Sequence, residues 1–152
     1  MIQVRAFGPG QEDAFLTLYR ACLDHYKVGP ARPEIEAEIL DDLHATRGMS
    51  ADLAFHDGRA IGFSTWVKVY PAANGIALYL KELFVIAEAR GLGAGKALMG
   101  NLVQTADQVG AVRLDWGSFQ PEALKFYDTL GATREEKVHF SVKRHDFDRF
   151  MQ

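Results

Sequence analysis

Apolar side chains recur at two different spacings along the chain of 152 residues, and each spacing predicts a type of element. Where they recur every three or four residues, as in the segment 11–26, one face of a helix is apolar and can pack on a core. Short apolar runs flank Asp57-Gly58, a dipeptide that favours the tight turns of β-hairpins. Helices are expected at 11–26, 33–47, 95–109 and 121–130, and residues 146–152 are expected to form a short helix or a frayed end. Strands are expected at 2–7, 51–56, 60–69, 76–86, 111–116 and 138–143. A turn is expected at 71–75, between the third and the fourth of these strands.

The order of these elements predicts one α+β domain that spans residues 1–152. The three successive strands between 51 and 86 form an antiparallel meander. The helix at 95–109 lies between the strands 76–86 and 111–116, and a strand–helix–strand crossover of this kind joins parallel strands. We therefore expect a single-domain fold with a mixed antiparallel and parallel sheet flanked by helices.

Composition and charge narrow the function classes. With 17 Lys and Arg against 20 Asp and Glu, the net charge is −3, which gives no general nucleic-acid-binding surface. No apolar run reaches the ~20 residues that span a bilayer, and residues 1–10 lack the apolar core of a signal peptide, so we expect a cytoplasmic protein without a membrane partner. The single cysteine, Cys22, agrees with a reducing compartment. The five histidines show no metal-ligand spacing, so no metal is expected.

The clearest chemical signal is the glycine-rich segment RGLGAGK, residues 90–96, between a predicted strand and a predicted helix. Glycines let the backbone approach a ligand, and a following helix N-terminus presents free N–H groups, so the segment predicts a pyrophosphate site. A Walker A loop would need one more residue between Gly91 and Gly95, and Ser or Thr in place of Ala97. A dinucleotide fingerprint would need glycine in place of Lys96 and a position after the first strand. Neither pattern fits.

The pattern that does fit is [Arg/Gln]-x-x-Gly-x-[Gly/Ala], matched by residues 90–95 after the last strand of the meander. A second motif, QPEALKFYDTLGA at 120–132, is similar to the segment N-x-x-A-x-x-F/L-Y…G-A/F. With the element order, these two motifs resemble the GNAT superfamily of acyl-CoA-dependent N-acyltransferases over essentially the whole chain. The strand LYLKELFV, residues 78–85, and the second motif are most similar to the diamine (spermidine/spermine-type) N-acetyltransferase branch.

The resemblance implies an acetyl-CoA site and gives roles to its residues. Backbone N–H groups of the glycine loop would hold the diphosphate, helped by the side chains of Arg90 and Lys96. A splayed strand end would bind pantetheine and polarise the thioester carbonyl through free N–H groups. Tyr127 matches the general acid that protonates the departing thiolate. The implied coenzyme-binding residues are Leu83, Phe84, Val85, Arg90, Gly91, Leu92, Gly93, Ala94, Gly95, Lys96, Gln120, Ala123 and Phe126.

The general base is assigned to Glu82. Lys81 stands where the diamine branch has its catalytic glutamate, and Glu82 comes next. Adjacent strand residues face opposite sides, so Glu82 takes over this role only if a bulge intervenes. A water chain, or another residue such as Asp115, is the alternative base. Gln120 replaces the asparagine of the family motif and keeps its amide group.

Residues and resemblance together predict an acetyl-CoA-dependent N-acetyltransferase that works by direct attack in a ternary complex. The expected acceptor is a small primary amine: a polyamine, an amino acid or its derivative, or an aminoglycoside-like compound. A protein N-terminal or lysine acetyltransferase is one alternative. A catalytically silent acyl-CoA-binding module with a regulatory role is the other. The family resemblance also suggests a homodimer.

Overall fold

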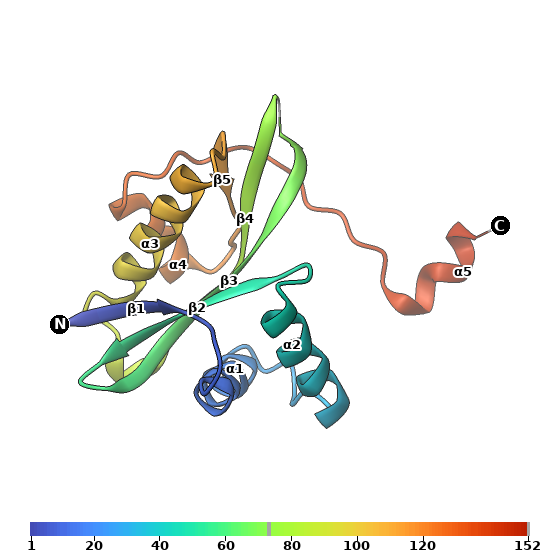
Figure 1. Ribbon diagram of the computed structural model, residues 1–152. Helices are drawn as coiled ribbons and strands as arrows, with labels where there is room; N and C mark the ends of the chain where they lie inside the picture. The colour runs from blue at the N-terminus through green and yellow to red at the C-terminus, as the bar shows by residue number, and fades with distance from the viewer. Residues whose placement is uncertain (73, 152) are drawn as a thin grey trace. The chain divides into compact units, whose positions relative to one another are not determined.

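The computed structural model describes residues 1–72 and 74–151 (Figure 1). Contacts group the chain into two compact units, Met1–Gly117 and Ser118–Gln152, and each is described by itself. The expected turn at 71–75 includes residue 73, which lies outside the described residues, as does residue 152 at the expected C-terminal helix.

A five-stranded sheet forms the centre of the first unit, with the strands in sequence order. Neighbouring strands pair antiparallel from β1 to β4, whereas β4 and β5 pair parallel, as the strand–helix–strand order predicts. Asp57 and Gly58 have φ angles of 49° and 78°, the left-handed conformations of a type I′ hairpin turn. The strands are β1 (Ile2–Ala6), β2 (Ser50–His56), β3 (Arg59–Ala72), β4 (Gly75–Val85) and β5 (Arg113–Asp115).

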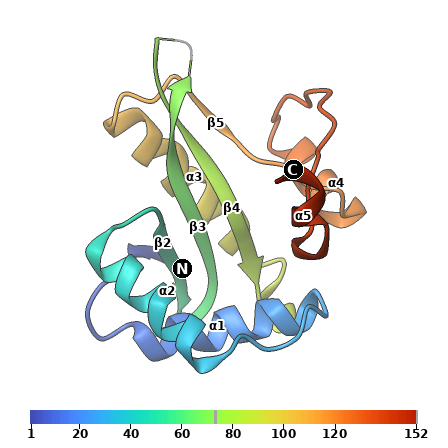
Figure 2. The same cartoon turned by 90° about the vertical axis from the view of Figure 1, so that its right-hand side faces the viewer.

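Helices cover both faces of this sheet, and side chains that alternate along the strands form a core with each. Helices α1 (Glu12–His25) and α2 (Pro33–Ala45) pack on one face, where Phe15 and Phe63 are fully buried. Helix α3 (Ala94–Gln108) packs on the other face through Leu98 and its neighbours. In Figure 2, α1 crosses at the end of β4. The predicted α+β class, a mixed sheet flanked by helices, is confirmed.

The second unit consists of short helices and irregular chain: α4 (Pro121–Thr129), a 3₁₀ turn at Arg144–Asp146 and α5 (Phe147–Phe150). The strand predicted at 138–143 is wrong, because these residues form no regular element. Their period-two pattern is typical of a strand, but a strand needs a neighbour for its backbone hydrogen bonds, and no strand lies among residues 118–151. The side chains of Val138 and Phe140 are accordingly 78% and 86% exposed.

Candidate active site

The glycine loop follows β4 through a single 3₁₀ turn at Ala87–Ala89 and leads directly into α3. Gly91 and Gly93 have φ angles of 85° and 91°, which a side chain would disfavour, so these two glycines are needed for the path of the loop. The first hydrogen bond of the helix joins Ala97 N–H to Gly93 O at 2.9 Å. The N–H groups of residues 94–96 therefore lie in the first turn of α3, where a helix has none of its own carbonyls to bind them. Free N–H groups at a helix N-terminus are the arrangement that the predicted pyrophosphate site requires.

One edge of β4 loses its neighbour before the strand ends. The parallel pairing with β5 stops at Tyr79, opposite Asp115, whereas the pairing with β3 continues to Val85. The next residue, Ile86, donates its N–H to Ile61 O on the β3 side at 3.0 Å. Hydrogen-bonding direction alternates along an antiparallel pair, so residue 84 also faces β3, while residues 83 and 85 direct N–H and C=O to the edge that β5 leaves open.

This alternation separates the three residues predicted at the splayed strand end. Leu83 and Val85 present backbone groups to the open edge and pack their side chains with the α3 cluster. Phe84 has its backbone on the β3 side and its side chain in the α1 cluster, where it is 6% exposed. Of the three residues, Leu83 and Val85 are the ones whose backbone groups reach the open edge.

Arg90 connects the open strand edge to the glycine loop. Its Nε donates to Val85 O at 3.1 Å, which satisfies a carbonyl that β5 does not reach. This bond anchors the Arg90 side chain to the last residue of β4, at the start of the glycine loop. Lys96, in the first turn of α3, is exposed. Both cations predicted for the pyrophosphate site thus lie on or beside the loop.

A β-bulge interrupts β4 just after its pairing with β5 stops. Thr65 on β3 pairs with Glu82, and the next residue, Trp66, pairs with Leu80, so Lys81 is the extra residue of the bulge. The sequence required such a bulge for Glu82 but gave no sign of one. Glu82 Oε1 accepts a hydrogen bond from Lys81 Nζ at 3.0 Å. The carboxylate predicted as the base is therefore part of an ion pair.

The alternative base and a neighbouring hydroxyl have different environments. Asp115 Oδ2 accepts from Arg113 Nε at 2.7 Å, so this carboxylate is engaged on its own strand. Thr65, directly opposite Glu82 in the ladder, is 3% exposed, and its Oγ1 has no hydrogen-bond partner among the described residues. Thr65 could not be selected from the sequence, because its burial beside Glu82 depends on the strand register.

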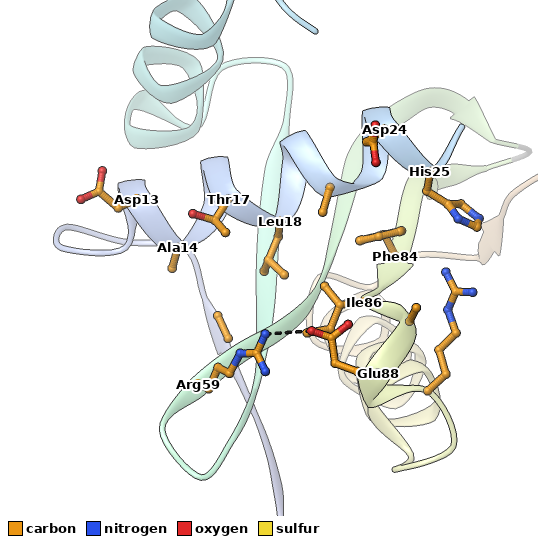
Figure 3. Close-up of a pocket in the computed structure, with 14 residues that line it drawn as sticks. Asp13, Ala14, Thr17, Leu18, Asp24, His25, Arg59, Phe84, Ile86 and Glu88 are labelled. Carbon is orange, nitrogen blue, oxygen red and sulfur yellow. Dashed lines mark hydrogen bonds and ion pairs between the residues drawn. The ribbon is translucent and has the colours of Figure 1, made fainter. Parts of the chain in front are cut away.

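A cavity of about 630 Å³ lies between α1, the start of β3 and the connection from β4 to α3 (Figure 3). Its lining includes the apolar side chains of Leu18 and Phe84, and Arg90 from the loop. Arg59 Nη2 and Glu88 Oε1 form an ion pair of 2.9 Å on its wall. The cavity thus contacts the same strand end and the same loop that carry the predicted coenzyme residues.

The other predicted residues belong to the second unit. Gln120 precedes α4 in an extended conformation, and Ala123, Phe126 and Tyr127 lie on the helix. The rings of Phe126 and Tyr127 contact each other with centroids 5.2 Å apart, although the two residues occupy neighbouring positions on the helix. Tyr127 O accepts the N–H of Ala132 at 3.3 Å beyond Gly131 (φ 80°), which ends the helix in the manner predicted for glycine.

Within residues 1–72 and 74–151, no helix is long and apolar enough to cross a membrane. In the same residues, no three His, Cys, Asp or Glu side chains lie together in a group that could hold a metal ion.

Comparison with known sequences places the chain among acetyltransferases. The family described as Acetyltransferase (GNAT) family matches residues 13–132. Mycothiol acetyltransferase of Arthrobacter sp. (strain FB24) is 32% identical over 143 residues, covering 88% of this chain and 43% of the relative. Mycothiol acetyltransferase of Thermomonospora curvata is 34% identical over 146 residues, covering 88% and 44%. The chain thus spans less than half the length of the curated relatives it matches.

Solved structures share the fold at low sequence identity. An integron cassette protein from the mobile metagenome of V. cholerae has a TM-score of 0.83 at 22% identity, over 99% of this chain and 98% of that one. The acetyltransferase AAC(6')-Iy, in complex with a bisubstrate analog of CoA and acetylneamine, has a TM-score of 0.80 at 19% identity, over 95% and 99%. The family match, the relatives and the shared fold agree with the glycine loop and the open strand edge, and the chain belongs to the acetyltransferase (GNAT) family.

Proposed function

We propose that this chain transfers an acetyl group from acetyl-CoA to a primary amine by direct attack in a ternary complex. The observation that carries the proposal is the continuity of β4, the glycine loop and α3. An open strand edge with outward N–H groups leads into positive-φ glycines and then into a helix N-terminus. The amide groups of a pantetheine chain can form hydrogen bonds with such a strand edge, and a negatively charged pyrophosphate can bind to the N–H groups of such a loop. Acetyl-CoA carries both, and the family uses it.

In this mechanism the loop and the strand edge hold the donor. Backbone N–H groups of residues 91–96, with the side chains of Arg90 and Lys96, bind the diphosphate. The N–H groups of Leu83 and Val85 bind pantetheine and polarise the thioester carbonyl, where a single donor is worth about 3 kcal/mol of barrier. Gln120, Ala123 and Phe126 complete the coenzyme contacts by the second motif.

The proton transfers fall to Glu82 and Tyr127. The ammonium group of the acceptor loses its proton to Glu82, directly or through a water that the Thr65 hydroxyl can bind. The neutral nitrogen attacks the thioester carbon, and the C–S bond breaks once the C–N bond has formed. The thiolate takes the phenolic proton of Tyr127, a transfer between groups with pKa values of about 8.5 and 10. The attacking nitrogen still has a second proton to lose, and this proton returns through solvent to the Tyr127 phenolate, while Glu82 releases its proton to water. The products are the N-acetylated amine and coenzyme A.

The acceptor is a small amine in this proposal. The names of the relatives and structural neighbours refer to different compounds, mycothiol and aminoglycosides among them, and the strand at 78–85 is similar to the diamine branch. These names support amine acetylation and leave three acceptor classes to be tested: polyamines, amino acids and aminoglycoside-like compounds.

Thermal stabilisation tests the coenzyme assignment. Acetyl-CoA at about 100 times its Kd should stabilise the folded chain by about 2.7 kcal/mol, because it binds only the native state. ATP and NAD, which lack pantetheine, should stabilise much less at the same concentration. Equal stabilisation by ATP would show that the loop is a general phosphate site and would contradict the proposal.

Turnover separates an enzyme from a silent binding module. Glu82→Gln should lower kcat/KM and move the rising limb of the pH–rate profile towards the pKa of the free amine, since this variant can use only amine that is already neutral. Acetyl-CoA stabilisation should persist in the variant. An unchanged profile would assign the base role to another group, and binding without turnover of any amine by the wild type would favour the silent module.

A further inference from the structure

The bulge in β4 turns two opposite charges towards the same helix. In a regular strand Lys81 and Glu82 would face opposite sides of the sheet, but Lys81 is the extra residue between two ladder pairs. Burial raises the pKa of Tyr19 on α1 and of Tyr26 directly after it, and the charge of Glu82 raises both pKa values further while that of Lys81 opposes it. The same two charges act in the same senses on Cys22, one turn away. Both charged groups therefore lie near α1.

Together they form a contact ion pair on the surface of the molecule. Lys81 Nζ and Glu82 Oε1 are 3.0 Å apart, and their side chains are 64% and 32% exposed. The pair is accessible to a ligand, and its two ends present opposite charges. An acceptor with two ammonium groups would bring one of them against Lys81, where like charges repel. An acceptor that carries both charges would avoid this conflict.

We infer that the acceptor is a zwitterionic amine, an amine with a carboxylate a few bonds away, which binds its nitrogen at Glu82 and its carboxylate at Lys81. The inference rests on the proposed function and names its acceptor class. In an α-amino acid the nitrogen and the carboxylate oxygens lie on neighbouring carbons, so their spacing is comparable to the 3.0 Å of the protein pair. Two such pairs can align head to tail and form charge-assisted hydrogen bonds on both sides.

The rest of such an acceptor has a place to lie. Phe84 follows Glu82 by two residues on the same strand, and its side chain lines the cavity of about 630 Å³. His25, at the end of α1, lies beside it with ring centroids 5.8 Å apart (Figure 3). A side chain attached to the zwitterion can extend over these rings into the cavity. The ion pair fixes the charged end, and the cavity accommodates the variable end.

Matched acceptors test this inference. Acetyl-CoA consumption by the full chain would be measured with each of the common amino acids, with the corresponding amino-acid amide, and with a diamine such as 1,5-diaminopentane. We expect kcat/KM for the best amino acid to exceed that for its amide by about tenfold, the effect of one charge-assisted hydrogen bond. Equal or faster turnover of amides or diamines would overturn the zwitterion assignment and leave N-acetyl transfer intact.

Substitution of Lys81 is the second part of the test. Lys81→Gln should raise KM for the amino acid about tenfold with little change for the amide, and Lys81→Glu should shift the preference towards the diamine. Lys68→Gln, an exposed lysine on the adjacent strand, serves as the control and should leave both acceptors unchanged. If Lys81→Gln retains the full preference for the carboxylate, the inference is wrong. Wild-type protein that binds acetyl-CoA and acetylates no amine would overturn the proposed function and this inference with it.

Discussion

Gly62 gives the sharpest test of how tightly the strand end is held. A Cβ atom built at this position would lie 2.7 Å from the carbonyl oxygen of Phe84 and 3.1 Å from Cγ2 of Val85. Real Cβ contacts are essentially never closer than 3.0 Å, and the nearest atom is backbone, so Gly62→Ala must push β4 away from β3. Overpacking of this kind costs about 1–3 kcal/mol, and the lower chain entropy of unfolded alanine returns about 0.4–1 kcal/mol.

The net expectation is a loss of about 1–2 kcal/mol in the free energy of unfolding, or roughly 3–6 °C in Tm for a chain of this size. Urea denaturation with and without acetyl-CoA would measure it, and acetyl-CoA binding should weaken as well, since residues 83–85 move with the strand. Gly100→Ala is the matched control: this exposed glycine inside α3 has no atom within 4 Å of the new Cβ, so the change should stabilise the chain by about 1 kcal/mol. A Gly62→Ala variant as stable as the wild type would refute the reasoning.

Three further predictions concern ionisable groups. Tyr127→Phe should lower kcat by about 10²-fold, while acetyl-CoA should still stabilise the folded variant. Tyr70→Phe, at an exposed tyrosine, is the control. Unchanged turnover of the Tyr127 variant would remove Tyr127 from the mechanism. Burial raises the pKa of Asp52 above its ordinary 3.8, although Trp66 Nε1 donates to its Oδ2 at 3.0 Å. The protonated form is thus favoured in the folded chain, so the free energy of unfolding should fall as pH rises through the folded pKa of Asp52. Asp52→Asn removes this titration and should flatten the fall, as measured by urea denaturation at a series of pH values. A steeper fall in the variant would contradict the reasoning. Burial raises the pKa of Cys22 to about 12, so thiol reagents should label it slowly in the native chain and completely in denaturant; rapid native labelling would show an open α1.

Much of the fold could be predicted because local chemistry specifies it. Asp57-Gly58 adopts the hairpin turn that its residue types favour, and the strand–glycine loop–helix order produced the parallel pairing of β4 and β5. The glycine loop was found for the same reason, since positive φ at Gly91 and Gly93 is a property of the residue itself. Each of these features depends on neighbours in sequence.

Features that depend on partners in space could not be predicted. The bulge at Lys81 exists because Thr65 and Trp66 pair with residues two apart on β4, and nothing in the alternation of residues 78–85 marks it. The strand predicted at 138–143 was wrong for the converse reason. The pattern of these residues suits a strand, but a pattern does not supply a neighbouring strand for its hydrogen bonds. The alternation that assigns Leu83 to the open edge and Phe84 to β3 likewise became visible only with the ladder.

At the open edge of β4, the side chain and the backbone N–H of the same residue face different surroundings. Leu83 and Val85 turn their side chains to the α3 core and their amides to the open edge. Amino-acid identity at these positions is therefore governed by packing, while the N–H groups that we propose to hold the thioester are present in every residue type except proline. Directed evolution at 83 and 85 should change thermostability and leave donor recognition in place. In the binding mode inferred above, new acceptor preferences would have to be selected at Lys81 and along the cavity, where side chains would contact the acceptor.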